Sequence, residues 1–80
     1  MKNAPSVQAA EPFTAEELSQ IEEHVGSQLS GRVHDFHLRA CDDGLVLCGR
    51  ARTYYAKQLA QQLVMRATEL PIRANDIQVT

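Results

Sequence analysis

The dipeptide Asp43-Gly44 constrains the fold more than any other part of this sequence, because it lies between two segments in which apolar and polar residues alternate. Asp-Gly in such a setting is the strongest short-range signal for a β-hairpin with a two-residue turn. Side chains alternate between the two faces of a strand, so the turn predicts one register and one apolar face. The expected cross-strand pairs are Ala40 with Leu47, Leu38 with Gly49 and Phe36 with Ala51.

The opposite face of the hairpin is polar and has an excess of basic side chains. It carries His37, Arg39, Cys41, Val46, Cys48, Arg50 and Arg52. An antiparallel sheet commonly packs one face on the core and leaves the other face solvated. We therefore expect this second face to meet water or a partner.

The segment before the hairpin predicts an amphipathic helix. Thr14 is a good N-cap, and Glu17 three residues later completes a capping box. Phe13 before the cap and Leu18 inside the helix form a hydrophobic staple. The apolar stripe of this helix consists of Leu18, Ile21, Val25 and Leu29. Gly31 is a natural stop for the helix because glycine adopts the left-handed conformation without strain.

A second helix is expected after the hairpin. Thr53 is suited to be its N-cap, and Pro71 should end it near Glu69 or Leu70. Its expected apolar face consists of Tyr55, Leu59, Leu63, Ala67 and Leu70, widened by Ala56, Ala60 and Val64. Tyr55 is thus expected to face the core, whereas Tyr54 is expected to be more exposed.

The last residues predict one more strand, in which Ile77 and Val79 are the buried pair. The order helix, strand, strand, helix, strand predicts the α+β class, as an αββαβ two-layer sandwich with two helices on one face of a three-stranded mixed sheet. A chain of 80 residues has room for one small domain. We expect residues 1–12 to form a flexible tail and residues 13–80 to form that domain.

Composition and charge exclude several classes of protein. A net charge of −2 argues against nucleic-acid binding, which usually needs a strongly basic face. There is neither an apolar run near the roughly 20 residues that span a bilayer nor a secretory signal. The chain as written is expected in the cytoplasm, or at the cell envelope if it is a fragment of a longer chain. Because no catalytic triad pattern or phosphate-binding glycine loop occurs, we expect neither enzymatic activity nor a cofactor.

Four potential metal ligands lie in or near the hairpin: His34, His37, Cys41 and Cys48. His34 and His37 are three residues apart, so on a regular strand they face opposite ways. Cys41 and Cys48 share a face, but they are diagonal in the predicted register, at about 7–8 Å between backbones. That spacing exceeds the roughly 5.5–6 Å typical of a disulfide. We expect neither a metal site nor a disulfide.

Several stretches, in this order, resemble the BON domain, a small bacterial module named after osmotic-stress and nodulation proteins. They are the hairpin glycine Gly44, the alternation LVLCGRA with Gly49, the helix YYAKQLAQQLV and the closing NDIQV, within residues 14–80. The resemblance implies an αββαβ fold and a noncatalytic module that attaches to phospholipid membranes, often in the bacterial envelope.

The candidate binding residues are His37, Arg39, Arg50, Arg52 and Tyr54. The arginines and the histidine could receive anionic lipid headgroups or an acidic protein partner, and Tyr54 could lie at a membrane interface. Two simpler interpretations stay open: a sheet face kept soluble by its charges, and an ordinary exposed tyrosine. The alternative function is a protein-interaction module, with weak self-association through an exposed sheet edge.

Overall fold

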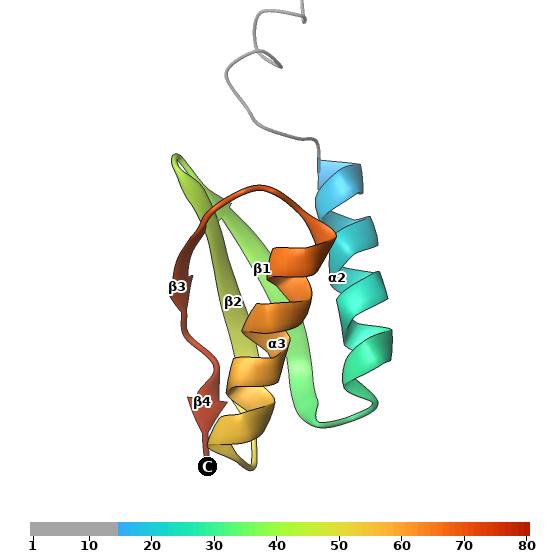
Figure 1. Cartoon of the computed structure of the whole chain (residues 1–80), viewed down its shortest axis with the longest axis vertical. Coiled ribbons are helices and arrows are strands. Elements are labelled where there is room, and N and C mark those ends of the chain that lie inside the picture. The colour runs from blue at the N-terminus through green and yellow to red at the C-terminus, as the bar shows by residue number, and fades with distance from the viewer. Residues whose placement is uncertain (1–14) are drawn as a thin grey trace, which may run out of the picture.

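The structure is a computed structural model that describes residues 15–80, and it confirms the predicted α+β class. In chain order its elements are α2 (Ala15–Leu29), β1 (Val33–Cys41), β2 (Gly44–Ala51), α3 (Tyr54–Ala67), β3 (Ile72–Asn75) and β4 (Gln78–Val79). Both helices lie side by side on one face of the sheet (Figure 1). The tail expected over residues 1–12, the Thr14 cap and the Phe13 staple lie outside the described residues.

The hairpin forms, but its predicted register was wrong by two residues. The turn consists of Asp42 and Asp43, so that Cys41 pairs with Gly44 and, farther along, Leu38 pairs with Leu47. Because the shift is an even number of residues, the apolar side chains keep the face that the sequence predicted.

Gly44 belongs to β2 rather than to the turn because it lies against the segment before β3. A Cβ atom on Gly44 would lie 2.5 Å from the carbonyl oxygen of Pro71. The neighbouring Leu45 amide donates to that same oxygen at 2.9 Å. Glycine at this position therefore lets the start of β2 lie close to the backbone of Pro71, although the two segments are distant in the sequence.

A β-bulge interrupts β1. His34 pairs with Arg50 and His37 pairs with Cys48, so that Asp35 and Phe36 together stand opposite Gly49. Asp35 takes a φ of 55° and Gly49 a φ of 147°. A bulge of this kind adds one residue to one strand and bends it.

The bulge changes which residues of β1 face the core. Val33 and Leu38 are both buried, although a regular strand would place an odd and an even position on opposite faces. By the same reversal, His34 and His37 share the outer face of the sheet. The expectation that these two histidines face opposite ways was therefore wrong.

The sheet formed by residues 15–80 has four strands rather than the predicted three. β3 and β4 both run parallel to β2 and lie along the same edge of it. In the break between them, the Asp76 amide still donates to the Leu47 carbonyl oxygen of β2 at 2.8 Å, while the Ile77 amide donates to Oδ1 of Asn75 at 3.2 Å. Ile77 is buried as expected, but Val79 is 44% exposed, so the prediction of a buried pair was wrong for Val79.

Asn75 also ties this break to α3. Its Nδ2 donates to the carbonyl oxygen of Lys57 at 3.1 Å and to Oε1 of Gln61 at 3.2 Å. The Asn75 side chain thus accepts a hydrogen bond from the backbone that follows it and donates two hydrogen bonds to α3. These contacts hold the end of β3 beside the middle of α3.

Helix α3 begins as predicted, and Leu59, Leu63 and Leu70 of its expected apolar face are partly buried against the core, whereas Tyr55 and Ala67 are exposed. Oγ1 of Thr53 accepts a hydrogen bond from the Ala56 amide at 3.1 Å, which confirms the N-cap. The helix ends at Ala67, earlier than Pro71 suggested, and the Thr68 amide closes it by donating to the carbonyl oxygen of Val64. The residues of α3 that are buried are Ala56, Ala60 and Val64. Tyr55 is 64% exposed, so its expected position in the core was wrong.

The core lies between the helices and the inner face of the sheet. The α2 stripe is confirmed, since Val25 and Leu29 are buried and Leu18 and Ile21 are partly buried against them. The sheet contributes Val33, Leu38, Leu45, Leu47 and Ala51, and the break between β3 and β4 contributes Ile77. Apolar burial of this kind is the main favourable term in folding.

The free edge of β1 is partly covered by α2. The Leu38 amide points away from β2 and donates to Oε1 of Glu22 at 3.0 Å. An unpaired edge amide is a template for pairing with another chain, and a carboxylate that occupies it blocks that pairing. The opposite edge is divided into two short segments, β3 and β4.

Replacing Gly49 with alanine should destabilise the fold by about 3 kcal/mol, because strain and steric overlap add. The new Cβ would lie 2.9 Å from Cγ1 of Val33 and 3.0 Å from the carbonyl oxygen of His34. Gly31→Ala is the matched control, since Gly31 has a φ of 81° but nothing within 4 Å of its Cβ position. It should lose only about 1 kcal/mol in urea unfolding. Equal losses in the two variants would contradict the steric part of this explanation.

Replacing Glu22 with alanine should remove the acceptor of the Leu38 amide and open the edge of β1. We expect a stability loss of about 1–3 kcal/mol, because a partly buried donor loses its partner. We also expect concentration-dependent self-association in sedimentation velocity. Glu22→Gln keeps an oxygen acceptor and should stay close to the wild type in both measurements. A Glu22→Ala variant with wild-type stability and association state would show that this contact does not protect the edge.

Candidate functional site

The five residues predicted to bind a lipid or a partner are all exposed, but they do not form one cluster. They are His37, Arg39, Arg50, Arg52 and Tyr54. Arg50, Arg52 and Tyr54 lie where β2 ends and α3 begins. Arg39 pairs with Val46, four residues earlier in β2 than Arg50, which separates it from this end by about 13 Å along the sheet.

The structure adds two residues to that end that were not among the predicted binding residues, Arg32 and His34. One hollow of about 490 Å³ includes Arg32, His34 and Arg52 in its lining, and a second of about 310 Å³ includes His34, Arg50 and Arg52. The two hollows share His34 and Arg52, so they adjoin. The surface formed by Arg32, His34, Arg50 and Arg52 is named the basic end below.

The basic end carries a net positive charge in a chain whose net charge is −2. Within residues 15–80, Asp35 is the acidic residue that forms an ion pair with the basic end, and its Oδ2 lies 2.8 Å from Nη2 of Arg50. Among residues 15–80, Arg32 and Arg52 have no acidic partner within ion-pair distance. Three arginines against one aspartate leave a charge of +2, and no acidic residue lies in the first turn of α3 to offset it.

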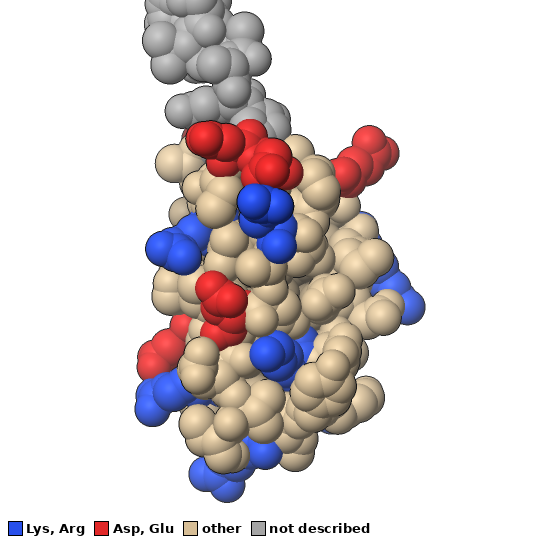
Figure 2. All heavy atoms as spheres, turned by 90° about the vertical axis from the view of Figure 1, so that its left-hand side faces the viewer, with Lys and Arg blue, Asp and Glu red and all other residues tan. Residues whose placement is uncertain are grey.

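The opposite end of the molecule is acidic. The start of α2, the hairpin turn and the connection after α3 meet there (Figure 1). Its acidic residues are Glu16, Glu17, Asp42, Asp43 and Glu69. Arg73 pairs with Asp43 at 3.3 Å, and Arg66 lies in the last turn of α3, so these two arginines offset part of this charge. In Figure 2 the main group of acidic side chains lies toward the upper end, and the lowest charged side chains are Lys or Arg.

Exposed apolar surface also gathers at the basic end. Four large hydrophobic side chains of the described residues are exposed: Tyr54, Tyr55, Met65 and Val79. Tyr54 and Tyr55 open α3, and Val79 pairs with Ala51 at the end of β2, so three of the four border the basic end. Only Met65 lies near the other end of α3.

The outer face of the sheet is less polar and less crowded with charge than the sequence suggested. Val46, expected to be on the solvated face, is only 4% exposed because it lies in the central strand between Arg39 of β1 and Ala74 of β3. Arg39, which pairs with Val46 on this face, is far from the basic end.

The two cysteines are free and partly buried. In the observed register Cys41 pairs with Gly44 and Cys48 pairs with His37, which sets them about 13 Å apart along the sheet. The diagonal neighbourhood expected from the sequence was therefore wrong. Within residues 15–80, no three His, Cys, Asp or Glu side chains come close enough together to hold a metal ion.

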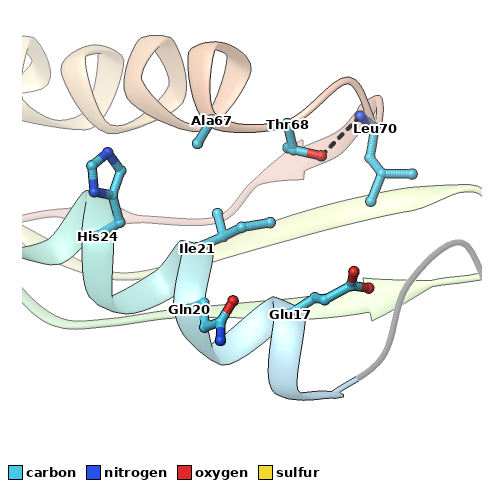
Figure 3. A pocket seen from close by; sticks show the side chains of 7 residues that line it. All are labelled: Glu17, Gln20, Ile21, His24, Ala67, Thr68 and Leu70. Carbon is cyan, nitrogen blue, oxygen red and sulfur yellow. Dashed lines mark hydrogen bonds between the residues drawn. The ribbon is translucent and has the colours of Figure 1, made fainter.

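A third hollow, of about 500 Å³, lies between the start of α2 and the end of α3 (Figure 3). Its lining residues are Glu17, Gln20, Ile21, His24, Ala67, Thr68 and Leu70. Ile21 and Leu70 supply the larger apolar side chains, and Oγ1 of Thr68 accepts from the Leu70 amide at 3.2 Å. The hollow has no basic residue except His24, so its chemistry differs from that of the basic end.

Neither helix of residues 15–80 has both the length and the apolar character needed to cross a membrane. Comparisons with protein-family models, with curated proteins and with solved structures return no match to this chain. The likeness to BON domains accordingly stays a prediction from the residues that carry it.

Proposed function

We propose that this chain is a noncatalytic, BON-like module that associates peripherally with phospholipid membrane surfaces rich in anionic lipids. The basic end carries this proposal. Arg32, Arg50 and Arg52 come from separate segments of the chain, yet they converge on two adjoining hollows. Arginine is suited to such a role because its planar guanidinium can bind phosphate oxygens with two hydrogen bonds.

The strength of such an association follows from the number of charges. Each Lys or Arg near an anionic leaflet contributes about 1 kcal/mol, and the attraction fades within a Debye length of about 8 Å at physiological salt. A surface with a net charge of about +2 therefore supports weak, reversible and salt-sensitive binding. Membrane-crossing helices or lipid anchors are not required for this kind of attachment.

Self-association, the alternative raised by the sequence, has less support from the geometry. Pairing along β1 would have to displace Glu22 from the Leu38 amide. Pairing along the other edge would have only the short strands β3 and β4 to use. Short or covered edges are how monomeric sheet proteins avoid such contacts.

Vesicle sedimentation tests the proposed function. The protein should bind vesicles that contain about 30% phosphatidylglycerol at ~20 mM salt, and it should bind them much less at ~200 mM salt, because screening shortens the reach of the attraction. Vesicles of phosphatidylcholine alone are the control and should leave the protein in the supernatant. The proposal is wrong if the anionic vesicles sediment no protein at low salt.

A further inference from the structure

We infer that the module docks end-on: the basic end faces the membrane, and the long axes of the helices rise away from it. This inference rests on the proposed function and adds an orientation and a contact surface to it. In this pose Arg32, Arg50 and Arg52 meet the lipid phosphates, while Tyr54, Tyr55 and Val79 enter the headgroup layer. The open face of the sheet, to which the sequence pointed, is then not the docking surface.

The distribution of apolar side chains supports this orientation. Tyr54 and Tyr55 are 63% and 64% exposed, and Val79 is 44% exposed, all beside the arginines. Tyrosine favours the boundary between membrane and water, where its ring is in an apolar layer and its hydroxyl is hydrated. Basic and aromatic side chains on one surface are what an anionic membrane interface attracts.

The separation of charge along the molecule supports it as well. α2 has 15 residues and is therefore about 22 Å long, so the acidic end lies more than two Debye lengths (about 8 Å each) from the basic end. When the basic end touches an anionic surface, the acidic end is screened from it. A pose with the helices parallel to the membrane would bring some of the acidic residues close to the anionic lipids, where they would be repelled.

The alternative pose, with the sheet face on the membrane, offers fewer contacts. Arg50 is available to either pose, and its ion pair with Asp35 weakens its contribution equally in both. Arg39 is the remaining arginine of the face, opposite the buried Val46. No tyrosine of α3 could contribute, because α3 lies on the other side of the sheet (Figure 1).

Single tryptophan reporters test the orientation directly, because the chain contains no tryptophan. Tyr55→Trp places the reporter at the basic end, and Met65→Trp places a matched control on the same helix near the opposite end. The two sites are 64% and 57% exposed, so solvent access is similar in the free protein. On phosphatidylglycerol vesicles the Tyr55→Trp emission should shift to the blue and be quenched by lipids with brominated chains, and that of Met65→Trp should not.

Charge reversal provides a second, independent readout. Arg52→Glu and Arg66→Glu change the net charge equally, but only Arg52 belongs to the basic end. Arg52→Glu should weaken binding to anionic vesicles by about thirtyfold, whereas Arg66→Glu should change it by less than about threefold. Urea unfolding of both variants excludes loss of the fold as the reason.

The outcomes separate the orientation from the function. Vesicle binding with equal quenching of both reporters, or with equal effects of the two reversals, would overturn the end-on pose and leave membrane association standing. Absence of vesicle binding by all variants and by the wild type would overturn the proposed function, and the pose with it. If millimolar inorganic phosphate binds at the basic end, read as shifts of its amide resonances, while anionic vesicles sediment no protein, a small phosphate compound and not the membrane is the partner, which also contradicts the pose.

Discussion

The contact between the β1 bulge and Gly49 is the constraint on which both the core and the basic end depend. Asp35 and Phe36 occupy the space opposite one residue of β2, and a side chain at Gly49 would overlap Val33. The extra residue turns Val33 into the core and His34 outward, next to Arg50. A regular strand would bury His34 and expose Val33, which would cost apolar burial and remove a side chain from the basic end.

The features that could be predicted from the sequence are those that depend on interactions between residues close together in the chain. The Thr53 cap, the α2 stripe and the existence of the hairpin each depend on residues within a few positions of one another. The register of the hairpin could not be predicted, because Gly44 packs closely against the backbone of Pro71, which is distant in the sequence. The break between β3 and β4 likewise depends on hydrogen bonds from Asn75 to α3, a contact that no short pattern reveals.

The candidate site was predicted in part for the same reason. Arg50 and Arg52 follow from alternation along β2, and their exposure could be expected from the hairpin alone. Arg32 lies in a connection with no periodicity, and His34 was assigned to the wrong face because a bulge leaves no clear signal in one sequence. Their place beside Arg52 depends on how the end of α2 meets the start of α3, which is a matter of tertiary packing.

The packing of α3 explains why the tyrosines are at the surface. Ala56, Ala60 and Val64 are the residues of this helix that meet the core, and their small size lets the helix lie close to the sheet. Successive helical residues are about 100° apart, so contact through Ala56 turns Tyr55 away from the core. A larger residue at the contact would hold the helix farther from β2 and separate its first turn from Arg50 and Arg52. The same close packing that forms the core thus gathers exposed aromatic rings and arginines at one end of a chain that is acidic overall.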